Sequence, residues 1–505
     1  MQLKFIHYVV IARLSGFVLF MIAKYSRSLL SLCLAVSISL PSTSFANSLA
    51  LPDIGTVAGA TLTIDQENRY GDAYMRMLRA SQPVINDPVI NDYLNHLGHR
   101  LVANANDVKT PFTFFLIQDP NINAFAFFGG YIALHSGLFL HAQTESELAS
   151  VMAHEIAHVT QRHLARSMED QARRSPATLA ALAGSLLLAI AAPQAGIAAI
   201  TATTAGNIQG QINYTRSNEK EADRIGIATL AKAGFDTQAM PRFFGRLADE
   251  YRYASQLPPM LLTHPLPEDR ITDSRERAQH YPKNLVSPSL NYQLTRARII
   301  ARHAKLETPA ALSWFEHNKK QNNAVLTKAA LYGEALIALD EHDYPKAQSR
   351  LESLLKQENH NLFYLDAMTD LYLANKQADQ AEQLLETALI EQPNNTVLLI
   401  NYANVLIEQK KYSEALRLLQ RYTHNHPNDT NAWHLLSKAS FHLQNHAEEQ
   451  AALGELFALN ANWNKAIKAY TQASQLAPLG SLSQARYDAR IDQLLIERER
   501  FLQLK

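Results

Sequence analysis

The chain has 505 residues, too many for a single hydrophobic core, and this length predicts two or three domains. Hydrophobic residues make up 47% of it and charged residues 19%, which excludes a disordered or fibrous protein. Basic and acidic residues number 47 each, and this balance argues against nucleic acid as the main partner, because phosphate binding needs a basic face.

The first 46 residues have the pattern of a secretory signal peptide. Two basic residues precede the apolar run 29–40, and Ala46 ends the small-residue segment after which cleavage is expected. Met21 is a second candidate start codon, and a membrane anchor is the alternative interpretation, although the run is short for a span. The only cysteine, Cys33, lies in this segment. Any metal in the exported, soluble product must therefore be bound by His, Asp or Glu.

A phenylalanine-rich stretch, residues 123–134, has a loose strand-like alternation. It contains Gly129 and Gly130, and a glycine pair permits a sharp chain reversal and a close approach of another backbone. We expect a strand that begins at Asn123 and pairs with an extended substrate through sequence-independent backbone hydrogen bonds. A plain core strand is the alternative.

Residues 144–163 have the pattern of an amphipathic helix. Thr144 and Glu147 have the spacing of a capping box, which predicts the helix start. Apolar side chains at helical spacing supply its buried face, namely Leu148, Val151, Met152 and Val159.

Two histidines on this predicted helix have the spacing of metal ligands. His154 and His158 are one turn apart, so both imidazoles can reach one ion. Glu155 is rotated away from that axis but is close enough to act on the attacking water, as general base and then as general acid to the leaving amine. This His-Glu-x-x-His motif alone only suggests a zinc site, because a five-residue match can occur by chance. A third ligand is needed to support the assignment.

Residues 175–215 contain no charged side chain. They are rich in Ala, Gly and Leu, but Pro193 interrupts the apolar core and residues 201–211 are too polar for lipid. We interpret the stretch as a helix pair that covers the site as a lid. Loose contact with a membrane surface or an unfolded client is the alternative.

The third ligand is expected just after this stretch. Asn218 with Glu221 resembles a helix start, and the helix is expected to end near Gly234. On it, Glu219 and Asp223 share one face, whereas Glu221 points elsewhere. We assign Glu219 as the metal ligand and Asp223 as the carboxylate that orients a ligand histidine. Without the histidine pair, the same segment would be interpreted as a solvent-exposed acidic helix start.

His264 lies between Leu262 and Pro265, in a predicted loop that proline stiffens. Its imidazole could occupy the fourth metal position and hold the enzyme at rest, or it could hydrogen-bond the oxyanion of the transition state. A structural histidine is the third possibility. Arg270 is placed to hold the loop, and the remaining histidines, His163 among them, are left as structural.

The C-terminal part is helical and repetitive. Residues 281–320 form a helical connector, and residues 321–495 carry a 34-residue period, marked by Ala347, Ala381 and Ala415. A small residue at the helix contact with a nearby aromatic is the tetratricopeptide pattern, in which helix pairs stack on one another. About four repeats are indicated, the outer ones degenerate.

Four motifs in the N-terminal region resemble those of the M48 zinc endopeptidases. These are the His-Glu-x-x-His motif, the Glu-x-x-Ala-Asp motif that begins at Glu219, the stretch Asn123–Gly130, and His264-Pro265 through Arg270. The resemblance covers about residues 60–280. Phe128 departs from the pattern, since many members have proline there. With a signal peptide and C-terminal repeats, the resemblance implies a Gram-negative periplasmic protease that assists or removes stalled outer-membrane proteins.

The sequence thus predicts a mostly helical α+β protein. A signal peptide, residues 1–46, precedes a gluzincin-type metalloprotease domain, residues 47–280, which binds one zinc per chain, and an all-α repeat solenoid follows the connector. We expect a zinc endopeptidase with chaperone-like activity whose repeats bind outer-membrane proteins and possible assembly partners, with at most peripheral membrane contact. The alternatives are a docking adaptor with a resting or vestigial zinc site and an intracellular regulatory peptidase.

Overall fold

The computed structural model describes residues 62–174, 216–254, 257–284 and 286–502. The predicted signal peptide and the whole of the predicted lid, residues 175–215, lie outside these ranges. The described residues all belong to one compact unit, Ala58–Lys505. In the part of the chain that the structure describes, no helix combines the length and hydropathy needed to cross a membrane.

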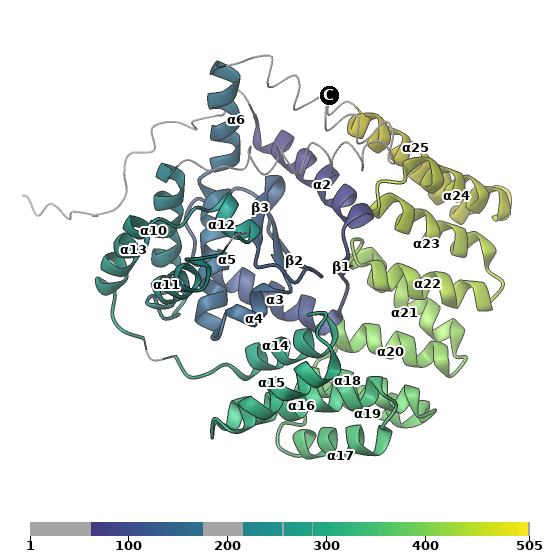
Figure 1. Cartoon of the computed structure of the whole chain (residues 1–505). Helices are drawn as coiled ribbons and strands as arrows, with labels where there is room; N and C mark the ends of the chain where they lie inside the picture. The colour runs from purple at the N-terminus through teal and green to yellow at the C-terminus, as the bar shows by residue number, and fades with distance from the viewer. Residues whose placement is uncertain (1–61, 175–215, 255–256, 285, 503–505) are drawn as a thin grey trace, which may run out of the picture. The chain divides into compact units, whose positions relative to one another are not determined.

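The N-terminal domain combines a small sheet with helices (Figure 1). Its strands are β1 (Val84–Ile85), β2 (Thr113–Ile117), β3 (Ala124–Phe127) and β4 (Tyr131–His135). Its helices are α2 (Ile64–Ser81), α3 (Pro88–Val102), the 3-10 turn η1 (Phe128–Gly130), α4 (Leu138–His141), α5 (Glu145–Thr160), α6 (His163–Arg174), α10 (Arg216–Lys232), α11 (Ala239–Tyr251), α12 (Pro259–Thr263) and α13 (Glu268–Gln279).

The strands form a mixed sheet in the order β1-β2-β4-β3. β2 and β4 are parallel, while β1 and β3 run antiparallel to their neighbours, so β3 is an edge strand of the described sheet. The reversal expected between β3 and β4 is present: Gly129 and Gly130 both have φ of 76°. The helix α5 packs directly against β3. The sheet edge therefore lies beside the helix that carries the His-Glu-x-x-His motif.

α5 begins where the sequence predicts. The Thr144 side chain accepts a hydrogen bond from the Glu147 N–H at 3.3 Å. The expected reciprocal half of the capping box is wrong, because the Glu147 carboxylate accepts instead from the Gln143 N–H at 2.6 Å and pairs with Arg246. Almost every residue of this helix is buried, which fixes the directions of its histidine side chains.

α10 also differs from its predicted start. The helix already includes Arg216, so Asn218 lies inside it and does not cap it. Its end is as expected, since Gly234 follows with a φ of 78°. α10 packs along α5, and Glu219 and Asp223 are buried in that contact.

The C-terminal part consists of helices arranged in consecutive pairs. The connector residues form α14 (Leu290–Arg302) and α15 (Thr308–Lys319). The repeat helices are α16 (Ala324–Asp340), α17 (Tyr344–Leu355), α18 (Leu362–Ala374), α19 (Ala378–Glu391), α20 (Thr396–Glu408), α21 (Tyr412–Asn425), α22 (Thr430–His442), α23 (His446–Leu459), α24 (Trp463–Leu476) and α25 (Leu482–Leu502). From α16 to α25 they make five pairs, one more than the sequence motif indicates.

The backbone keeps the 34-residue period further than the side chains do. The turn residues at positions 342, 376, 410 and 444 all have positive φ and are 34 apart. Ala347, Ala381 and Ala415 are fully buried at the helix contacts, as predicted. In the next copy this alanine is replaced, but α23 still begins 34 residues after α21. The repeat therefore persists in the fold after its sequence marker is lost.

Candidate metal centre

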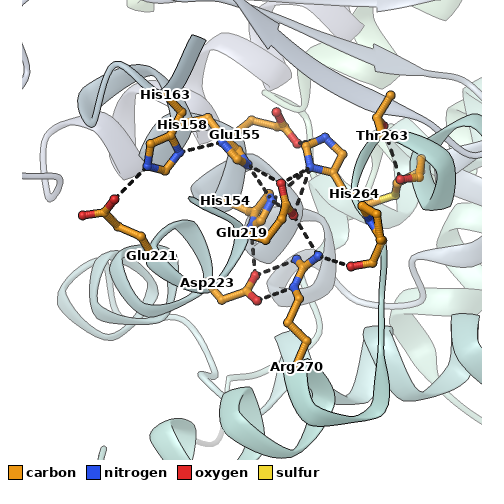
Figure 2. Close-up of polar contacts among 12 residues, drawn as sticks. His154, Glu155, His158, His163, Glu219, Glu221, Asp223, Thr263, His264 and Arg270 are labelled. Atoms are coloured by element: carbon orange, nitrogen blue, oxygen red, sulfur yellow. Dashed lines mark hydrogen bonds and ion pairs between the residues drawn. The ribbon is translucent and has the colours of Figure 1, made fainter. Parts of the chain in front are cut away.

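Four buried side chains bring possible ligand atoms to one place (Figure 2). His154 and His158 on α5, Glu219 on α10 and His264 at the end of α12 each offer one such atom, and these atoms all lie within 4.8 Å of one another. His154 Nε2 and His158 Nε2 are 2.9 Å apart. Each of these nitrogens lies 3.4 Å from a different oxygen of Glu219.

The donor set fits zinc. Nitrogen and oxygen ligands at about 2.0–2.1 Å from a tetrahedral zinc ion lie about 3.3 Å from one another. The separations between donors on His154, His158 and Glu219 are 2.9–3.4 Å, close to that value. Three of the donors are the residues expected from the sequence.

The electrostatics of the cluster also favour a cation. Burial lowers the pKa of His154, but Asp223 and Glu219 outweigh it and raise that pKa to about 10. Burial raises the pKa of Glu219, yet His264 and His154 hold it well below its ordinary value. Burial and the neighbouring His154 keep the pKa of His158 well below its ordinary value. The carboxylates of Asp223 and Glu219 thus favour a positive charge among the imidazoles. A bound metal ion would supply that charge.

His264 lies among the ligands. Its Nδ1 is 3.1 Å from Glu219 Oε1 and 3.4 Å from His154 Nε2. The loop expected around it is partly helical, because Leu262 belongs to the short helix α12 and the His264 N–H donates to the Met260 carbonyl at 2.8 Å. Of the two functional readings offered by the sequence, this geometry favours the fourth ligand position.

Glu155 lies beside His264 at the same site. It is completely buried, and its Oε1 is 3.5 Å from His264 Nε2. Within the described part of the chain, neither of its carboxylate oxygens accepts a hydrogen bond. A buried carboxylate without donors is costly unless a ligand or water meets it, and this is the environment expected for a general base.

Arg270 connects the remaining predicted residues. It donates to both oxygens of Asp223, at 2.6 and 2.9 Å, and pairs with Glu219 at 2.8 Å. It also donates to the Pro265 carbonyl at 2.8 Å, next to His264. Asp223 Oδ1 in turn lies 2.9 Å from His154 Nδ1. One guanidinium therefore holds two carboxylates of α10 and the segment that carries His264.

The residues of the predicted substrate strand lie along β3. Asn123 directly precedes the strand, and its carbonyl accepts a hydrogen bond from the His135 N–H at 3.0 Å. Gly129 and Gly130 lie at the other end, where a Cβ atom on Gly130 would come within 1.9 Å of the Pro111 carbonyl oxygen. The close backbone approach that the sequence predicts is thus an approach of the protein to itself.

The sequence interpretation missed two residues that lie behind the candidate ligands, His163 and Glu221. His163, left as structural, lies with Nδ1 2.8 Å from His158 Nδ1, and its Nε2 is 3.0 Å from Glu221 Oε2. The His163 hydrogen bond, with Arg166 nearby, lowers the pKa of Glu221 to about 2. The contact depends on the break between α5 and α6. Residue spacing on an uninterrupted helix could not reveal it.

Comparisons with known proteins agree with this geometry. The model of Peptidase family M48 matches residues 88–278, and a tetratricopeptide repeat model matches residues 372–439. The fold and the buried His/Glu cluster therefore define a metallopeptidase of the M48 class joined to tetratricopeptide repeats, as the sequence motifs predicted.

Relatives that match most of the chain identify a more specific family. The Beta-barrel assembly-enhancing protease of Escherichia coli K12 is 47% identical over 455 residues, 89% of this chain and 92% of that one. A Vibrio cholerae serotype O1 protein, named "Putative beta-barrel assembly-enhancing protease", is 70% identical over 480 residues, 95% of this chain and 99% of that one. The chain belongs to the family of beta-barrel assembly-enhancing proteases.

More distant matches cover parts of the chain. Mitochondrial metalloendopeptidase OMA1 of Schizosaccharomyces pombe is 26% identical over 209 residues, 41% of this chain and 56% of that one. Among solved structures, yeast Tom70 matches 69% of this chain and 82% of its own, with 11% identity and a TM-score of 0.29.

Proposed function

We propose that this metallopeptidase is a periplasmic zinc endopeptidase that acts in the assembly and quality control of outer-membrane β-barrel proteins. The observation that carries the proposal is the buried set of His154, His158 and Glu219 beside Glu155, whose carboxylate accepts no hydrogen bond within the described ranges. The clients are inferred from the names of the relatives, and the compartment from the signal-like residues 1–46.

His154, His158 and Glu219 would hold one zinc ion per chain. When bound, the zinc would polarise the scissile carbonyl and make an attacking water more acidic. Glu155 takes the proton from that water and passes it to the leaving amine. Neither of its oxygens accepts a hydrogen bond among the described residues, so both are available to an attacking water once His264 moves away.

His264 closes the site at rest. Its Nδ1 lies close enough to His154 and Glu219 to be a fourth ligand, in the position that a substrate or water would need. Catalysis then requires the segment after α12 to move. Arg270 binds both the Pro265 carbonyl in this segment and the carboxylate of Glu219. It therefore couples the position of His264 to the position of a metal ligand.

β3 is the proposed substrate strand. Among the described strands it pairs with β4 alone, and α5 packs against it. An extended polypeptide added to that edge would run past the metal centre and bind through backbone hydrogen bonds, which suits clients of varied sequence. Asn123 directly precedes this strand and the Gly129-Gly130 turn follows it, so the turn defines how far the edge extends.

The repeats are proposed to bind clients or their assembly machinery. Five stacked helix pairs provide an extended surface of the kind used for protein–protein interaction. The chaperone-like activity expected from the sequence would come from this surface and would not require cleavage.

The test is the Glu155→Gln variant of the full chain, with an unfolded outer-membrane β-barrel protein as substrate. Cleavage should fall by at least about a hundredfold while the zinc content measured by mass spectrometry stays at one per chain. Glu250→Gln, a half-exposed residue of α11, is the matched control and should cleave normally. If the parent binds zinc but does not cleave even after His264 is removed, the docking-adaptor interpretation replaces the protease.

A further inference from the structure

A histidine that the proposed reaction does not use, His163, contacts His158 on the side of the ring away from the metal centre (Figure 2). His163 Nδ1 lies 2.8 Å from His158 Nδ1, and His163 Nε2 lies 3.0 Å from Glu221 Oε2. Arg166 donates to the same Glu221 oxygen at 2.9 Å. The His163 side chain is fully buried, whereas Glu221 and Arg166 are partly exposed.

These contacts determine where the protons lie. His158 faces the metal centre with Nε2, so its Nδ1 must carry the proton when Nε2 is a ligand. Two ring nitrogens 2.8 Å apart share one proton, so His163 Nδ1 accepts it. The His163 proton is then on Nε2, from which it is donated to the Glu221 carboxylate. The hydrogen bonds all run in one direction, from the ligand outward to the carboxylate.

We propose that His163 and Glu221 are positioning residues that fix the tautomer and the ring orientation of His158. The inference rests on the proposed zinc function. His154 has the simpler version of the same arrangement, because its Nδ1 meets Asp223 directly and Arg270 holds that carboxylate. At His158 the carboxylate is one imidazole further away, and Arg166 holds it.

A helix break makes this arrangement possible. On an uninterrupted helix a residue five positions after His158 would point about 140° away from it. Arg162 instead adopts a φ of 54° between α5 and α6, and the turn brings His163 back to His158. The Arg162 guanidinium is itself held by Glu67 Oε1, at 2.8 Å, and by the Leu62 carbonyl.

The competing interpretation is that His163 only fills space in the core. The two interpretations differ in what a substitute must provide. A positioning residue needs an acceptor for the His158 proton, whereas a packing residue needs only volume. Asparagine places an amide oxygen near the position of Nδ1, while leucine provides volume without an acceptor.

The first experiment measures zinc release from the full chain to an excess of chelator. His163→Leu should release zinc about 10–100 times faster than the parent, and His163→Asn should recover most of the difference. His141→Asn is the matched control, since His141 forms a peripheral pair with Glu250 on α11, and its release should match the parent. Equal release from the parent and His163→Leu, or equally fast release from both His163 variants, would overturn the proposal.

A second pair of variants tests the outer carboxylate and serves if His163→Leu does not fold. Glu221→Gln keeps an oxygen that accepts from His163 Nε2, and should release zinc within about threefold of the parent rate. Glu221→Ala removes the acceptor and should release zinc faster than Glu221→Gln. Identical release from these two variants would overturn the role of Glu221. A parent chain that binds no zinc would overturn the proposed function itself, so the two failures are distinguishable.

Discussion

His264 and Glu219 lie 45 residues apart in the chain, yet His264 Nδ1 is 3.1 Å from Glu219 Oε1 and both side chains are buried. Glu219 is the proposed third metal ligand, so a histidine at this distance competes for the position where water and substrate must enter. We therefore propose that the residue that completes the donor set also keeps the site closed.

Replacing His264 should open the site. We expect His264→Ala to retain zinc through the other three ligands and to cleave an unfolded substrate several times faster than the parent, because the fourth position becomes accessible. Cleavage rate and zinc content, measured on the same samples, check this. If His264 instead donates to the oxyanion, the variant would be slower by about a hundredfold or more, with zinc unchanged.

Arg270 should matter more for stability than its single charge suggests. It neutralises Asp223 and Glu219, both buried, and its own side chain is 3% exposed. Arg270→Leu would leave two buried carboxylates uncompensated, and we expect a loss of about 3–5 kcal/mol in the free energy of unfolding of the zinc-free protein.

Chemical denaturation of zinc-free protein provides the measurement for Arg270. Arg277→Leu is the control, because Arg277 forms a partly exposed i,i+4 pair with Asp273 on the same helix and should cost about 0.5 kcal/mol or less. Equal effects of the two substitutions would mean that the buried network does not stabilise the fold.

The sequence predicts which candidate donor residues the fold brings together, for physical reasons. A ligand pair one helical turn apart is a local property, and so is the face shared by Glu219 and Asp223 on α10. The contact between His163 and His158 depends on a left-handed residue at Arg162, which no periodic pattern encodes. Local spacing is therefore readable, whereas a geometry created by a break between helices is not.

The sequence pattern also does not predict how the N-terminal domain packs against the repeat helices. Residues 281–320 read as a connector, but Arg298 on α14 is buried and pairs with Asp87 at the start of α3, at 2.6 Å, and with Asp366 on α18, at 2.7 Å. One hydrophobic core runs from the N-terminal domain into the repeat helices. Long-range pairs of this kind leave no periodic trace in the sequence.

Asp87 should make stability depend on acid pH. Burial raises its pKa, but Arg298 outweighs this and holds the pKa well below its ordinary value of 3.8. A carboxyl whose pKa is lowered by folding stabilises the protein above its unfolded pKa, and this contribution is lost as the pH falls toward the folded pKa. The loss should therefore begin below about pH 4.

Asp87→Asn isolates this effect, because asparagine can keep the cap hydrogen bond to the Ile90 N–H while removing the charge. At pH 7 the variant should be less stable by about 2–3 kcal/mol. The gap to the parent should shrink by about 1.4 kcal/mol for each pH unit below about 4. Denaturant titrations at several pH values measure it, and a gap independent of pH would contradict the assignment.

Gly130 distinguishes a structural role of the β3–β4 turn from a role in substrate binding. Its φ of 76° is unfavourable for other residues, and a Cβ atom would come within 1.9 Å of the Pro111 carbonyl oxygen. We expect Gly130→Ala to lower the free energy of unfolding by about 2–3 kcal/mol or more. Gly245 in α11 has open space around its missing Cβ, so Gly245→Ala should instead raise stability by about 0.5–1 kcal/mol. If Gly130→Ala were as stable as the parent but bound substrate poorly, the turn would serve the substrate and not the fold.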